Sequence, residues 1–146
     1  MAQFARPDAD IVDGNWVKST GGNVNLFQMI DETPFDDADY IESGLAPATD
    51  AVAVNLSDVT DPVSSINHIV RYRYGKDSAA GAQIDIVVQL RQGYVSEGAQ
   101  GTLIHAETHT NVSSGFTAGT FTLSGGEADA ITNYADLQIR ITANQV

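Results

Sequence analysis

The residues best suited to bind a metal or transfer a proton are the three histidines, His68, His105 and His109. His105 and His109 stand four apart, the spacing of a zinc pair on one helix face, but the metalloprotease motif has Glu directly after the first His, where this chain has Ala106. The threonine-rich surroundings favour a strand, on which the two imidazoles would lie about 13 Å apart, too far to share a metal. His68 falls on the apolar side of its segment, as a hydrogen-bonded core histidine does. We therefore expect no metal site at any histidine.

The carboxylates are numerous, but none has the spacing of a known site. The segment Asp8–Gly14 invites comparison with an EF-hand calcium loop, which needs oxygen ligands at its first, third and fifth positions, then glycine, and a glutamate at its end. Here the third aspartate comes one position late, glycine follows it, and Ser19 stands where the glutamate belongs. The denser acidic run Asp31–Asp39 has no defined register and is typical of a solvated turn.

Motifs for covalent or phosphate chemistry are missing as well. The chain has no G-x-S-x-G nucleophile elbow and no glycine loop leading from a strand into a helix. No pair of carboxylates is singled out for glycoside hydrolysis. The sequence thus predicts a protein that is not an enzyme and that uses no cofactor.

Charge narrows the range of partners. The 146 residues include 7 Lys and Arg against 19 Asp and Glu, a formal net charge of −12. Such a surface repels nucleic acid and anionic lipid, because binding to either depends on cationic contacts with phosphate. No secretory pattern and no run of about 18 apolar residues is found, so we expect no membrane segment. The scarce positive residues gather on two strands and form an expected contact patch for an acidic neighbour or for another copy's acidic loops: Arg71, Arg73, Lys76 and Arg91.

Alternation of apolar and polar residues predicts several short strands. The clearest are Ile66–Tyr74 and Ala82–Leu90, and Ala135–Ala143 repeats the pattern. Glycine, proline and aspartate turns separate these segments, which indicates an all-β fold, an antiparallel β-sandwich of jelly-roll kind. The remaining expected elements are strands at Val24–Ile30 and Ala51–Leu56, a hairpin of Thr102–Thr110 with Phe116–Leu123, and a short helical turn within Gly125–Asn133.

The first 22 residues differ from the rest, and we expect residues 1–22 to form an extended N-terminal arm before a β-sandwich domain at residues 23–146. Segments of this kind are often ordered only where they lie across another surface. The only tryptophan, Trp16, is either a plug for one end of its own domain or an anchor at an interface. The predicted interface residues are Arg6, Pro7 and Trp16 of the arm and Arg71, Arg73 and Arg91 of the patch.

Six segments, in a fixed order that spans most of the chain, carry a resemblance to a known group of proteins. They are Arg6–Trp16, Ile30–Ile41, Asp61-Pro62, His68–Asp77, Ile84–Gly93 and Ile131–Ala143. As a collinear set they resemble the small β-sandwich structural proteins of tailed bacteriophages. At this size the chain looks most like a capsid decoration, or cement, protein.

The resemblance implies a virion component on the outer surface of the capsid. Proteins of this group commonly sit as trimers over threefold positions and tie neighbouring capsomers together. The implied partners are therefore the major capsid protein and further copies of the chain. Two alternatives remain open: a carbohydrate- or receptor-binding module, since jelly rolls often host sugar sites, and a minor tail or fibre component.

Overall fold

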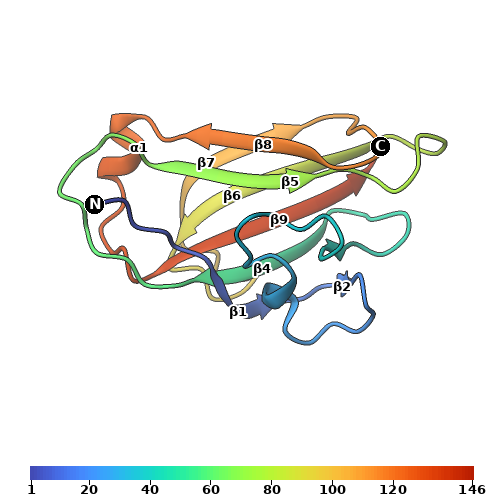
Figure 1. Cartoon of the computed structure of the whole chain (residues 1–146), viewed down its shortest axis with the longest axis horizontal. Coiled ribbons are helices and arrows are strands. Elements are labelled where there is room, and N and C mark those ends of the chain that lie inside the picture. The colour runs from blue at the N-terminus through green and yellow to red at the C-terminus, as the bar shows by residue number, and fades with distance from the viewer.

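The computed structural model describes residues 1–146, and nearly all of its regular structure is β-strand (Figure 1). The chain is an all-β protein with antiparallel sheets packed against each other, as expected; the finer jelly-roll arrangement stays a prediction. No helix is long and apolar enough to cross a membrane. The elements are β1 (Pro7–Val12), β2 (Val17–Lys18), a 3₁₀ helix (Leu26–Met29), β3 (Ile41–Glu42), β4 (Asp50–Leu56), β5 (Ile69–Tyr74), β6 (Ile84–Gln92), β7 (Thr102–His109), β8 (Thr117–Thr122), α1 (Gly125–Asp129) and β9 (Leu137–Gln145).

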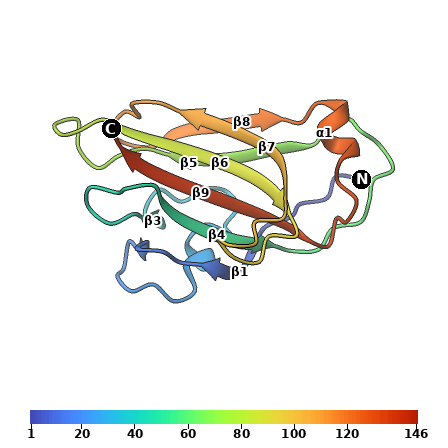
Figure 2. The same cartoon turned by 180° about the vertical axis from the view of Figure 1, so that it is seen from behind.

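The larger layer is a five-stranded sheet in the order β1-β4-β9-β6-β7 (Figure 2). At its centre β6 and β9 pair over nine residues each, so that Val88 lies opposite Ile141 and Leu90 opposite Ile139. Because side chains alternate along a strand, these register partners share the face that meets the second layer. The alternation predicted for these two strands is confirmed.

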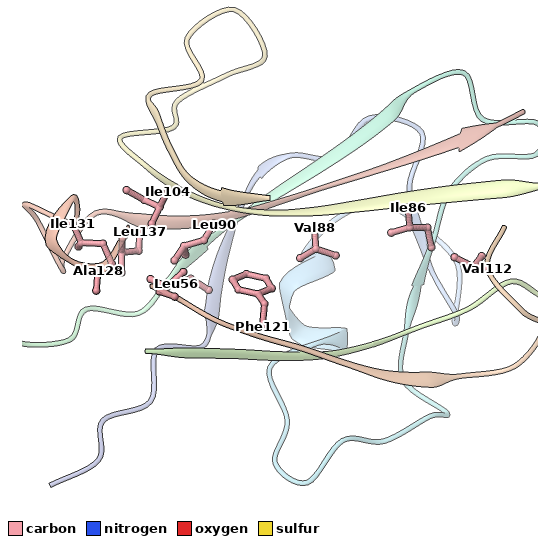
Figure 3. Close-up of a cluster of buried hydrophobic side chains, with 11 residues drawn as sticks. Leu56, Ile86, Val88, Leu90, Ile104, Val112, Phe121, Ala128, Ile131 and Leu137 are labelled. Atoms are coloured by element: carbon pink, nitrogen blue, oxygen red, sulfur yellow. The ribbon is translucent and has the colours of Figure 1, made fainter. Parts of the chain in front are cut away.

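The second layer consists of β5 and β8, which pair antiparallel and cover part of the large sheet. Val70 and Tyr72 of β5 turn inward, as the alternation of that strand predicts, and pack on the main core. Figure 3 shows how the core side chains of the two layers point toward one another. The main core consists of Leu56, Ile86, Val88, Leu90, Ile104, Val112, Phe121, Leu123, Ala128, Ile131 and Leu137.

The first strand shows that the expected N-terminal arm is wrong for residues 7–18. β1 pairs antiparallel with β4 and forms the edge of the five-stranded sheet. Asp10 of β1 accepts backbone hydrogen bonds from Leu26 and Phe27, both at 2.8 Å, which ties the strand to the 3₁₀ helix. The strand forms despite its polar composition because β4 offers backbone groups that need partners. Residues 7–12 therefore share a sheet with the rest of the chain, and β2 pairs with β3.

Trp16 acts as a plug within its own domain, so its assignment as an interface residue is wrong. Its side chain is buried among Leu26, Val52 and Ala143, which form a second, smaller core with it. The indole Nε1 donates to the carbonyl oxygen of Asp50 at 3.4 Å. An indole buries a large apolar area only if its N–H also finds an acceptor, and this site supplies both.

Two predictions about single elements are wrong: the strand at Val24–Ile30 and the hairpin of β7 with β8. The expected strand Val24–Ile30 contains a 3₁₀ helix, because Asn25 adopts a left-handed conformation and the Asp10 carboxylate receives the first amides. The expected hairpin of β7 with β8 is also wrong. β7 pairs with β6 and β8 pairs with β5, so the two strands lie in opposite layers. The helical turn after β8 is confirmed as α1, with Ala128 and Ile131 buried.

Replacing Gly119 with alanine is expected to destabilise the protein by about 1–3 kcal/mol, because overpacking a filled core costs that much. A Cβ at this position in β8 would lie 2.3 Å from the Tyr72 ring, which is held by a hydrogen bond to His109. Urea denaturation measures the change. Gly126→Ala is the control, since a Cβ there meets nothing within 4 Å. If the two variants had the same free energy of unfolding, the close approach of Gly119 to the Tyr72 ring would be contradicted.

Candidate protein-interaction surface

A long apolar cleft lies between β5 and the part of the large sheet that β4 and β9 form. It has a volume of about 1550 Å³ and runs between the two layers. Its floor is the inner face of β4 and β9, with Val54, Ile139 and Ile141, and Tyr72 of β5 contributes to its wall. We call this space the inter-sheet cleft. Its rims carry Phe4, Phe35, Tyr40 and Ile66.

The cleft exists because the second layer is narrower than the first. β5 and β8, of six residues each, cover a five-stranded sheet whose central strands have nine, so Ile139 and Ile141 of β9 are left only partly buried. The accessible surface reflects this: it measures 7834 Å², whereas a compact 15.5 kDa monomer exposes about 7200 Å². The large apolar side chains left exposed around the cleft are Met1, Phe4, Phe35, Leu45, Ile66, Ile69 and Phe116.

Contacts that the segment before β3 makes with β5 and with Phe116 narrow the cleft near the end of β5. Arg73 forms a two-point ion pair with Asp37, with Nε–Oδ1 at 2.5 Å and Nη2–Oδ2 at 2.7 Å. This hydrogen bonding to Asp37 raises the pKa of Arg73. Beside it, the rings of Tyr40 and Phe116 lie 5.4 Å apart. The acidic segment that the sequence suggests as a solvated turn thus lies against the end of β5 in part.

The predicted interface residues do not form one surface. Arg71 and Arg73 lie on the outward side of β5 and also line the cleft. Arg91 points outward from β6 in the opposite layer, so the expected patch of Arg71, Arg73, Lys76 and Arg91 does not form one surface. Arg6 and Pro7 lie near the far rim, where the Arg6 guanidinium donates to the Thr33 hydroxyl. Of the six predicted residues, Pro7, Arg71 and Arg73 line the cleft.

Arg91 instead belongs to a buried polar network on the outer face of the large sheet, which the sequence does not reveal. The β6–β7 connection folds over this face and brings Glu97 onto Arg140, with distances of 2.7 and 2.6 Å to the two carboxylate oxygens. Tyr94 also donates to Glu97. Arg91 reaches Gln89 at 2.8 Å and the Gln100 carbonyl at 3.0 Å. We call this set the outer-face network: Gln89, Arg91, Tyr94, Glu97, Gln100, Gln138 and Arg140.

Charge and burial in the outer-face network shift the pKa values of its ionisable side chains. Hydrogen bonding to Arg140 lowers the pKa of Glu97 to about 2. Burial, together with its bond to Glu97, raises the pKa of Tyr94 to about 12. Burial and the neighbouring charge of Arg140 lower the pKa of Arg91. The carboxylate of Glu97 thus binds the buried guanidinium of Arg140 and adds a favourable charge near that of Arg91. These contacts hold the β6–β7 connection against the large sheet.

The histidines lie apart, each with its own partner. His68 is hydrogen-bonded, as expected, but it is only partly buried and is not a core residue, whereas β7 is a strand, as the threonines predict. Each imidazole makes one bond of 2.7 Å: His68 to Tyr134, His105 to Glu127 and His109 to Tyr72. No group of three or more His, Cys, Asp or Glu side chains is placed to hold a metal ion.

Four of the five tyrosines contribute to folding contacts. Tyr72 and Tyr134 bond to histidines, Tyr74 stacks on His109 with ring centroids 3.9 Å apart, and Tyr94 is buried in the outer-face network. Burial and the nearby Glu107 raise the pKa of Tyr72 to about 12. Tyr40, at the cleft rim, contacts the ring of Phe116.

No family model, curated protein or solved structure matches this chain.

Proposed function

We propose that this chain is a structural protein of a phage virion, a decoration protein that binds the outer surface of the capsid. In this role it assembles as a trimer, contacts the major capsid protein and ties neighbouring capsomers together. Because it binds the assembled shell and not the separated subunits, it stabilises the shell by mass action.

The inter-sheet cleft is the observation that supports this proposal best. Ile139 and Ile141 of its floor are only partly buried, and Phe35 and Ile66 are exposed at the rim. Contiguous apolar surface of this kind is typical of a protein that is completed by contact with another protein. The six phage-like segments and the acidic surface agree with the same role, since acidic side chains keep the exposed parts soluble.

The test compares phage particles that carry the protein with particles made without its gene. Heating in the presence of a DNA-binding dye reports the temperature at which each shell ruptures. We expect particles without the protein to rupture at a lower temperature and added purified protein to restore the higher one. Gold-labelled antibody should decorate the head.

A matched pair of variants tests whether the inter-sheet cleft is the surface that attaches to the capsid. Ile66 at the cleft rim and Val95 on the outer-face side are 68% and 69% exposed. We expect Ile66→Asp to weaken attachment about tenfold or more, a loss of at least about 1.4 kcal/mol. Val95→Asp should attach like the wild type. Equal rupture temperatures with and without the protein would contradict the stabilising role, and label on the tail would contradict the capsid position.

A further inference from the structure

The edge of β5 that faces away from β8 has unpaired backbone groups. The Leu123 amide donates to the His68 carbonyl at 2.9 Å, which sets the alternation of the β5–β8 ladder. The backbone of Val70, Tyr72 and Tyr74 therefore bonds to β8. The N–H and C=O groups of the alternate residues point to the other edge, where no strand pairs: Ile69, Arg71 and Arg73.

This open edge borders the inter-sheet cleft, because Ile69, Arg71 and Arg73 are all among the residues that line it. A strand added beside β5 would turn every second side chain toward the inner face, level with Tyr72. Those side chains would cover Ile139 and Ile141, which are only partly buried. The inward positions of an added strand should therefore be apolar.

The outward positions of an added strand would lie beside Arg71 and Arg73. Arg73 already binds the carboxylate of Asp37, which also lines the cleft. Arg71 is exposed and has no side-chain hydrogen bond. Opposite charges on neighbouring strands stabilise a sheet, so acidic residues suit these positions.

The same arginines disfavour a second copy of β5 as the occupant. Antiparallel pairing of two copies about Arg71 would place Arg71 opposite its counterpart and bring both Arg73 side chains close by. Like charges directly opposite each other destabilise a strand pair. The edge therefore selects a different and acidic strand.

We infer that β5 accepts an additional strand from another protein, an extended segment in which apolar residues alternate with Asp or Glu. Its backbone bonds to Ile69 and Arg71, its apolar side chains enter the inter-sheet cleft, and its carboxylates face Arg71. Strand addition of this kind draws affinity from main-chain bonds and specificity from alternate side chains. The inference names the partner chemistry for the surface in the proposed function, but it can be tested without a phage particle.

The test uses the full chain and an end-capped peptide, VDVDVDV, with VKVKVKV as the basic control. Fluorescence polarisation measures binding, and amide hydrogen exchange by NMR locates it. We expect the acidic peptide to bind about tenfold or more tightly than the basic one. Its binding should slow exchange at Ile69 and Arg71, while Val70 and Tyr72 are already protected by β8.

Two variants with the same change in charge complete the test. Arg71→Glu should weaken binding of the acidic peptide about tenfold and favour the basic peptide. Lys18→Glu on β2, whose side chain makes no hydrogen bond, should bind like the wild type. Absence of binding, or binding without protection of the β5 edge, would overturn the inference. Protection that rises with protein concentration alone would overturn it in favour of a second copy. Capsid attachment could still be intact in any of these cases, so this failure is distinct from failure of the proposed function.

Discussion

Replacement of Trp16 by alanine is expected to lower the free energy of unfolding by about 3–5 kcal/mol, the usual cost of removing a large aromatic side chain from a core. The indole is 6% exposed and packs on Leu26 and Val52, which are almost completely buried. Nothing nearby is free to fill the space, because its neighbours belong to β4, β9 and the 3₁₀ helix. Urea denaturation followed by far-UV circular dichroism measures the change, since the variant has no tryptophan fluorescence.

Phe4→Ala is the matched control for Trp16→Ala. Phe4 is the other large aromatic residue among the first 22, but it is 66% exposed. Its replacement should change stability by about 0.5 kcal/mol or less, as surface substitutions usually do. If both variants lost equally little, the N-terminal segment would be a detachable arm after all.

Replacing Glu97 with glutamine is expected to cost about 2–3 kcal/mol. The Arg140 side chain is 11% exposed, and losing the carboxylate leaves it and Arg91 buried without a counter-ion. Breaking a fully buried pair costs more, but Glu97 is 42% exposed and solvent screens part of the effect. Asp37→Asn is the control: the Arg73–Asp37 pair has similar geometry, but its side chains are 29% and 49% exposed. We expect that change to cost clearly less than the replacement of Glu97, because solvent screens the exposed pair.

The contribution of Glu97 should also depend on pH. Its pKa in the folded protein is about 2, below the ordinary value of 4.5, because Arg140 stabilises the carboxylate. A lowered carboxyl pKa stabilises the fold fully above 4.5, and this stabilisation disappears as the pH falls toward 2. The difference in unfolding free energy between the wild type and Glu97→Gln should therefore shrink over that range. A difference that stayed constant would show that the charge of Glu97 is not responsible.

The direction in which a strand residue points could be predicted from the sequence. The alternation in β5, β6 and β9 correctly places Val70, Val88 and Ile141 toward the core. The same local reasoning finds the helical turn at α1, where Ser124 and Glu127 form a capping box. These features depend on neighbours in the chain, so they are readable from one sequence.

Strand pairing could not be predicted in the same way. The apolar patterns of β7 and β8 suit a hairpin with each other as well as the pairs they actually form. Such patterns fix which side of a strand is buried but not which strand lies beside it. The candidate surface could not be predicted for the same reason, because the inter-sheet cleft results from pairing five strands in one layer and two in the other.

The all-β class, the inward side of the main strands and the acidic surface follow from the sequence alone, because composition and a period of two are properties of the chain. The burial of Trp16 in a core, the burial of Arg91 beside Arg140 and the open edge of β5 are seen only once the chain is folded. Burial and pairing depend on segments far apart in sequence, such as Trp16 with Ala143 and Arg140 with Glu97. These contacts form when the sheets assemble, and no local pattern specifies them.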